Sequence, residues 1–178
     1  MSTTWSLEPA TVHRLRAAEG WLDLGNHLEA NEELEHIRPQ LRVHPEVLVL
    51  RWRICAKAKK WDACLMIARA LTDDLPEDPR GWIALAQTLR LQGKLRKAFV
   101  LAKSKALDFM DCWHLHYDAA RYGFLLGEFD DAEQFFTLAL AAGDPKEVRR
   151  RAQNDPDLTG FRRPARTREA RPRTRRVW

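Results

Sequence analysis

The sequence predicts an all-α fold, an α-solenoid of about four helical hairpins with a short capping helix, and three observations predict it. Between Pro79 and Asp111, apolar residues recur at helical spacing on both sides of Gly93, which indicates two amphipathic helices joined by a turn. The turn position recurs every thirty-four residues, at Gly25, Lys59, Gly93 and Gly127. A column of small residues recurs at the same interval, at Ala30, Cys64, Ala98 and Ala132. An internal period of this length is typical of stacked helical hairpins.

Both columns have physical causes. Glycine enters the left-handed conformation that ends many helices at little cost, so it suits the turn between two helices of a hairpin. A small side chain is needed where two helices cross closely, because a large one would hold them apart. We therefore expect Ala98 to be buried where the helices of the third hairpin cross.

The expected helices follow one another in pairs. The first hairpin should hold helices over 11–24 and 27–41, with Pro39 ending or bending the second of them. The later hairpins should hold helices over 46–58 and 61–74, 80–92 and 95–108, and 112–126 and 129–142.

A short ninth helix should close the array. Asp144 can cap its start and Pro145 fits the first helical position. The turn Asn154–Asp157 should end this helix. The predicted organisation is a lead-in over 1–10, a repeat domain over 11–160 and a tail over 161–178. Within the domain, the expected units are 11–44, 45–78, 79–112, 113–144 and a cap over 145–153.

The pattern resembles the tetratricopeptide repeat family, including a group of uncharacterised bacterial repeat proteins. The resemblance covers about residues 11 to 144. In the third repeat it is carried by Trp82, Leu85, Ala86, Leu89, Gly93, Leu95 and Ala98, and in the fourth by Ala120, Gly127, Phe129, Ala132, Phe136 and Ala139. The second repeat departs from the pattern at Lys59 and Arg51, and the first matches only at Ala18, Trp21, Gly25 and Ala30.

The resemblance implies a right-handed superhelix whose first helices line a concave groove, and a non-catalytic scaffold or adaptor that binds a protein segment in that groove. An acidic segment is one candidate for this partner. One polar column in the groove consists of Glu19, Arg53, Gln87 and Arg121. The peptide-groove candidates are Arg53, Lys57, Gln87, Arg90, Tyr117, Arg121 and Phe124.

Two interpretations of the polar column stay open. Arg53 and Arg121 are expected to be accessible on one face, where they could bind a partner's carboxylate through charge-assisted hydrogen bonds. Alternatively, the polar side chains only solvate an exposed helix face or pair with one another. Leu15 and Glu19 occupy two positions where some members of the family hold a peptide carboxylate, and neither side chain suits that role.

The tail, residues 161–178, has a different composition from the rest of the chain. It carries eight arginines and one glutamate, a charge of about +7, whereas the whole chain carries +5. Alone it should be disordered, since it has few core-forming residues. It is either a solvated end or an electrostatic arm for nucleic acid, an acidic protein or an anionic membrane surface. The arginines are Arg162, Arg163, Arg166, Arg168, Arg171, Arg173, Arg175 and Arg176. The alternative function is therefore a nucleic-acid-associated protein whose tail binds phosphates and whose repeats recruit a partner.

Other function classes find little support in the sequence. It has no phosphate-binding loop, nucleophile elbow or zinc-protease motif, so we expect no enzyme activity and no cofactor. Cys112, His114 and His116 could suggest a metal site, but on a helix the side chain at 114 would point away from the other two. No secretory signal or membrane-spanning stretch is evident, and three cysteines are an odd number, so we expect a cytoplasmic location with reduced thiols.

Overall fold

The computed structural model describes residues 7–158. Within that range the chain forms nine α-helices and short 3₁₀ turns at 39–41 and 156–158, without a strand, which confirms the all-α fold class. The α-helices are α1 (Pro9–Asp23), α2 (His27–Glu35), α3 (Pro45–Lys57), α4 (Trp61–Asp74), α5 (Pro79–Leu91), α6 (Leu95–Asp108), α7 (Trp113–Leu126), α8 (Phe129–Ala142) and α9 (Pro145–Asn154). The Arg-rich tail expected over 161–178 lies outside the described residues.

Local sequence explains where most helices begin. Proline occupies the first turn of α1, α3, α5 and α9, where its missing N–H costs no hydrogen bond. The side chains of Asn26, Asp78 and Asp144 cap α2, α5 and α9 by accepting a hydrogen bond from a backbone N–H of the first turn.

The second helix is shorter than the sequence predicted. We expected it to run to residue 41, but α2 ends at Glu35 and only a 3₁₀ turn, η1 (Pro39–Leu41), follows. Pro39 disfavours helical geometry in the preceding residue, and Arg38 is extended, with φ −52° and ψ 137°. The side chain of Arg42 folds back and donates to the carbonyl oxygens of Ile37 and Glu35, which stabilises the exposed end of the helix.

The four hairpin turns share one backbone geometry. Gly25, Gly93 and Gly127 have φ values of 84°, 77° and 78°, and Lys59 adopts the same left-handed conformation at 57°. In each turn the N–H of the next residue donates across the helix end at 2.9 Å, from residues 26, 60, 94 and 128 to the carbonyl five residues earlier. The turns thus repeat with the period seen in the sequence, although Lys59 is not a glycine.

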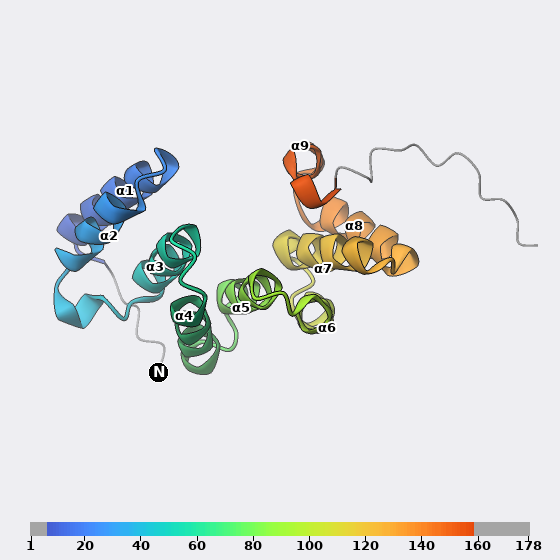
Figure 1. Ribbon diagram of the computed structural model, residues 1–178, viewed down its shortest axis with the longest axis horizontal. Coiled ribbons are helices and arrows are strands. Elements are labelled where there is room, and N and C mark those ends of the chain that lie inside the picture. Colours follow the sequence, from blue (N-terminus) through green and yellow to red (C-terminus); the bar gives the residue numbers. More distant parts are fainter. Residues whose placement is uncertain (1–6, 159–178) are drawn as a thin grey trace, which may run out of the picture.

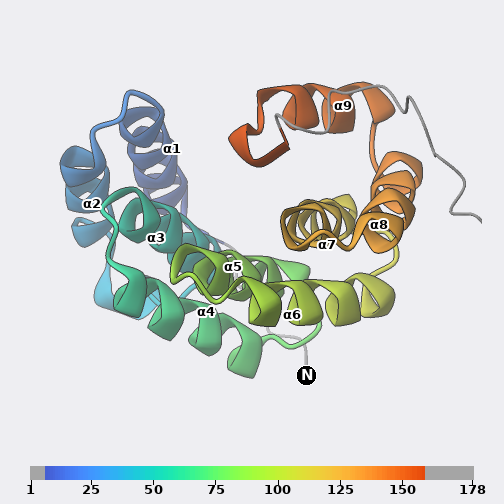
Figure 2. The ribbon, with the colours of Figure 1, turned by 45° about the vertical axis from the view of Figure 1, so that its right-hand side comes forward.

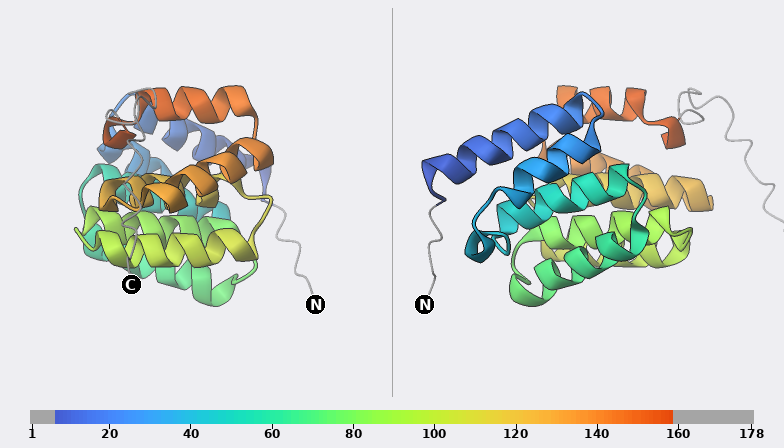
Figure 3. Two further views of the ribbon diagram at one scale, coloured as in Figure 1. Left: turned by 90° about the vertical axis from the view of Figure 1, so that its right-hand side faces the viewer. Right: turned by 60° about the vertical axis from the view of Figure 1, so that its left-hand side comes forward.

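The helices form two layers. Each helix packs on the next, and α1, α3, α5 and α7 also contact one another in succession. They therefore form an inner layer, with α2, α4, α6 and α8 outside it (Figure 1). The chain curves so that α1 and α9 face each other across an open side (Figure 2). Figure 3 shows from two other sides how the helices lie one above another.

Small residues lie at the crossings. Ala30, Cys64 and Ala98 are completely buried, and Ala132 is 1% exposed, as expected for this column. The buried residues divide into clusters along the chain rather than one central core. One cluster joins α1 to α3, a second joins α3 to α5, a third joins α5 to α8, and a fourth lies under α9. Each cluster is therefore built largely by neighbouring helices.

Candidate functional site

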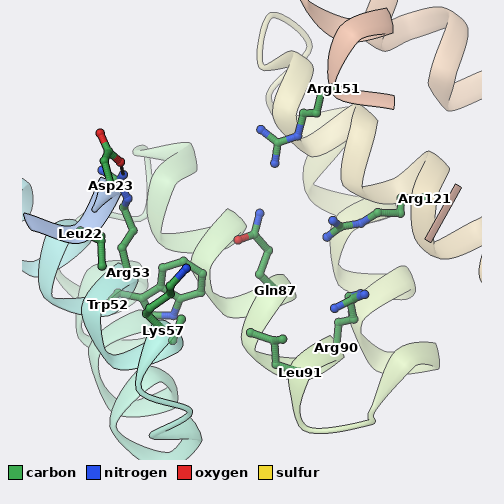
Figure 4. A pocket seen from close by; sticks show the side chains of 11 residues that line it. Leu22, Asp23, Trp52, Arg53, Lys57, Gln87, Arg90, Leu91, Arg121 and Arg151 are labelled. Carbon is green, nitrogen blue, oxygen red and sulfur yellow. Dashed lines mark ion pairs between the residues drawn. The ribbon is translucent and has the colours of Figure 1, made fainter. Parts of the chain in front are cut away.

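A groove opens on the inner layer, and we call it the inner groove. Its volume is about 490 Å³, and its lining comes from α1, α3, α5, α7 and α9. The lining residues are Leu22, Asp23, Trp52, Arg53, Ala56, Lys57, Gln87, Arg90, Leu91, Arg121 and Arg151. Figure 4 shows Arg53 and Lys57 on one side, and Arg90, Arg121 and Arg151 on the other. The lining thus contains five cationic side chains and one carboxylate.

The α3 side of the groove holds Arg53 and Lys57. Arg53 pairs with Glu19 of α1 at 2.9 Å and lies 3.9 Å from a carboxylate oxygen of Asp23. Its side chain is 40% exposed, so these pairs contribute little to stability. Lys57 lies one helical turn further on and is exposed, and no carboxylate of residues 7–158 is within ion-pair distance of it.

On the opposite side, Arg121 is held by carboxylates and only 13% exposed. It pairs with Asp118 at 3.0 Å and Asp155 at 3.2 Å, and it donates to the Tyr122 hydroxyl at 3.1 Å. Asp118 is nearly inaccessible, and Gln87 donates to its other oxygen at 2.9 Å. Such a charge can be buried because it is surrounded by opposite charge and hydrogen-bond partners.

A turn after α9 brings further carboxylates to this side. Asp155 accepts a hydrogen bond from the Tyr117 hydroxyl at 2.8 Å, and Asp157 pairs with Arg90. The Asp157 N–H donates to the Asp155 side chain at 3.0 Å, and this hydrogen bond within the turn stabilises its conformation. Burial alone would raise the pKa of Asp155, but the Tyr117 hydrogen bond and the charge of Arg121 outweigh it and lower that pKa. We call residues 155–157 the acidic turn.

Sequence reasoning missed the acidic turn as part of the groove. The turn itself was expected, but its carboxylates were assigned no contact. The sequence does contain a signal for this contact. Asp155 follows Arg121 by thirty-four residues, the interval that also separates Arg53 from its partner Glu19. Extending the polar column by one more period would have found Asp155. The structure thus shows pairing between neighbouring positions of the column at both of its ends.

The candidates predicted for the groove divide into three groups. Arg53, Lys57, Gln87, Arg90 and Arg121 all line it. Arg53 and Arg121 share this concave face, as expected, but the expectation that Arg121 is accessible is wrong, because it is only 13% exposed and pairs with the acidic turn. Tyr117 is completely buried beneath α9, and Phe124 packs edge-on against Phe129, with ring centroids 5.8 Å apart. Neither aromatic residue is among those that line the groove.

Arg151 is a groove residue that the sequence analysis did not single out. It projects from α9, and its guanidinium lies 5.0 Å from the ring centroid of Tyr117 and 5.6 Å from that of Trp113. These cation–π contacts hold the side chain while leaving its hydrogen-bond donors for other partners. Within the described residues, no carboxylate lies within ion-pair distance of Arg151.

The residues considered for a metal site have separate environments. His116 is completely buried, with Nε2 2.8 Å from the carbonyl oxygen of Met110. The His114 ring stacks on Trp113 at 3.8 Å, and burial, together with the charge of Arg151, lowers its pKa. In residues 7–158, no three histidine, cysteine or acidic side chains are grouped so as to hold a metal ion. The same part of the chain has no helix with the length and apolar character needed to cross a membrane.

No protein-family model matches the chain, and a search of the curated proteins finds no match.

Proposed function

We propose that the protein is a non-catalytic scaffold or adaptor that binds a peptide segment of a protein partner in the inner groove. The observation that carries this proposal is the convergence of side chains from α1, α3, α5, α7 and α9 on one concave site. A segment lying there would contact several helices at once, and concave surfaces of helical arrays serve this purpose in general.

We also propose that the two layers form a right-handed α-solenoid of the tetratricopeptide type, working in the cytoplasm. Support comes from the thirty-four-residue interval between paired groove residues and from the common left-handed turn at residues 25, 59, 93 and 127. The inner layer then corresponds to the first helices of the repeats, which that family uses to line its groove.

A photo-crosslinking experiment tests the groove assignment. A photoreactive residue placed at Lys57 should crosslink to peptides selected from a random library for binding, because Lys57 lines the groove. The same residue at Lys97, which is exposed on the outer-layer helix α6, is the matched control. Crosslinking at 97 but not at 57 would show that the selected peptides bind elsewhere and would contradict the proposal.

A further inference from the structure

We infer that the inner groove recognises an acidic peptide segment, whose carboxylates contact Lys57 and Arg151 and compete with Asp157 for Arg90. This inference rests on the proposed function, since it specifies the chemistry of the segment that the groove would bind. The cationic side chains of the groove differ in how many carboxylates of the chain already pair with them.

Two of the cations lack an anionic partner in the described chain. Arg53 already has Glu19, and Arg121 has Asp118 and Asp155. Lys57 and Arg151, in contrast, have no carboxylate of residues 7–158 within ion-pair distance, although both line the same groove. They stand on different sides of it, one on α3 and one on α9 (Figure 4). An extended segment with spaced carboxylates can therefore reach both.

Carboxylates of the chain itself already pair with two of the arginines that line the groove. The acidic turn places Asp155 and Asp157 against Arg121, Arg90 and the Tyr117 hydroxyl. Arginine favours such contacts because its planar guanidinium matches the geometry of a carboxylate. The turn is thus an internal ligand on the side of the groove that holds Arg90 and Arg121, opposite Lys57.

The two carboxylates of the turn are held differently. Asp155 is buried, and Leu158 beyond it is only 4% exposed and packs in the cluster under α9, so this part of the turn is a fixed element. The side chain of Asp157 is 17% exposed, and that of its partner Arg90 is 26% exposed. Arg90 can therefore exchange Asp157 for a carboxylate of another chain without disrupting the fold.

Charge balance favours a short acidic peptide over nucleic acid at this site. Glu19, Asp23, Asp118, Asp155 and Asp157 lie beside the five cations of the lining and offset much of their field. A continuous row of phosphates would meet these carboxylates as well as the cations. The lining also includes Leu22, Trp52 and Leu91, which can contact the apolar parts of a peptide.

Binding of defined probes to the full chain tests the inference. The probes are a fluorescent twelve-residue peptide with alternating Asp and Gly, its Asn-for-Asp counterpart, a Lys-for-Asp counterpart, and a single-stranded oligonucleotide. The acidic peptide should bind the most tightly of the four. Lys57→Glu should weaken its binding about tenfold, because hydrogen-bonded charge pairs contribute more than neutral ones.

Matched variants separate the groove from the rest of the chain. Lys97→Glu makes the same charge change on the outer layer and should leave binding within about twofold, since exposed charges at a distance are screened. Arg151→Gln should weaken binding, whereas Asp157→Asn should strengthen it severalfold by releasing Arg90. If the turn served only to stabilise the fold, Asp157→Asn would weaken peptide binding or leave it unchanged.

Each contrary outcome has a distinct meaning. Equal losses in Lys57→Glu and Lys97→Glu would place binding outside the groove, for example on the arginine tail, and overturn the inference. If the neutral peptide bound as well, with sensitivity to Lys57→Glu, the acidic preference would be wrong while the peptide-binding function stood. Stronger binding of the oligonucleotide, with the same sensitivity, would make nucleic acid the ligand. If none of the three peptides bound, the acidic preference would be wrong, and the proposed function would fail only if peptides selected from the random library also gave no crosslink at 57.

Discussion

Lys59 is the only residue other than glycine with a positive φ in residues 7–158. It takes the left-handed conformation at the turn between α3 and α4, where the other three hairpin turns have glycine. A side chain in this conformation is crowded against the following carbonyl, which costs roughly 1–2 kcal/mol. The hairpin therefore forms despite this residue, and the packing of α3 and α4 must offset the cost.

Replacing Lys59 by glycine should stabilise the protein. The strain is removed, but glycine also gains freedom in the unfolded chain, so a net gain of about 0.5–1 kcal/mol is expected. Chemical denaturation of wild type and Lys59→Gly measures it. The reverse change at the equivalent turn, Gly93→Lys, should destabilise by a similar amount, because a Cβ there meets nothing within 4 Å and only the backbone conformation is at issue. A loss of stability in Lys59→Gly would refute this account of the turn.

Ala98 tests the small-residue column. It is completely buried where α5 and α6 meet. Ala98→Leu should therefore overpack the crossing and cost about 1–3 kcal/mol in unfolding free energy. Lys97→Leu on the exposed neighbouring position is the control and should change stability little. An unchanged melting temperature in Ala98→Leu would contradict the proposed role of the column.

At the scale of whole elements, α9 and the acidic turn close the C-terminal end of the helical array. Val148 of α9 and Leu158 after the turn pack against Tyr117 and Ala139, while Asp155 joins Tyr117 to Arg121. The apolar contacts of this segment thus reach α7 and α8, and its polar contacts reach α7 and, through Asp157 and Arg90, α5. Removing the Asp155 carboxylate should therefore weaken the packing of the whole segment on the helical array.

Asp155→Asn should destabilise the protein near neutral pH, by roughly 1–3 kcal/mol, because Arg121 loses one of its charged partners. The pKa of Asp155 is lowered in the folded state. Its contribution to stability is therefore present above the unfolded pKa of about 3.9 and is lost as the pH falls through the lower folded value. Melting temperatures of wild type and variant should differ at pH 7, and the difference should shrink as the pH falls below the unfolded pKa of about 3.9. A constant difference across this range would exclude the charge of Asp155 as the cause.

How much the sequence could predict depends on whether an element is determined locally. The glycine turns and the burial of Ala98 follow from a period that neighbouring residues set, and the structure agrees with both. The prediction for the end of α2 was wrong because a proline also disfavours helical geometry in the residue before it. Pro39 therefore keeps Arg38 out of the helix. Arg151 could not be placed, since the face that α9 turns to the groove depends on how α9 docks on α8.

At the scale of the whole molecule, the arginine tail and the remainder of the chain carry opposite net charges. Residues 161–178 hold eight arginines and one glutamate, while the whole chain carries +5. The alternative function, binding of nucleic acid, depends on this segment. Arginine–phosphate contacts read charge and carry no base sequence, so any such binding should lack sequence specificity.

Deleting residues 161–178 should leave helicity and melting temperature nearly unchanged, because the segment has few core-forming residues. Affinity for nucleic acid should be lost. If all eight arginines contacted phosphates, the log–log salt slope of the full chain would reach roughly −6 to −7. Titration of both forms with single- and double-stranded DNA and RNA at two salt concentrations measures this. Equal binding by the truncated form would assign the affinity to the helical domain instead.

The division of the core into successive clusters implies that the protein does not open all at once. In residues 7–158, the hairpin of α1 and α2 packs mainly against α3, and its ion pairs, such as Glu19–Arg53, are exposed. Further along the chain, α7 lies between α6 and α8, and Arg121, only 13% exposed, is tied to the acidic turn. In stacked arrays stability is roughly a sum over neighbours, so opening should begin at α1 and α2. Their amides should exchange with deuterated water sooner than those of α7, and raising the salt concentration should widen the gap, since salt screens the exposed pairs more than the buried ones.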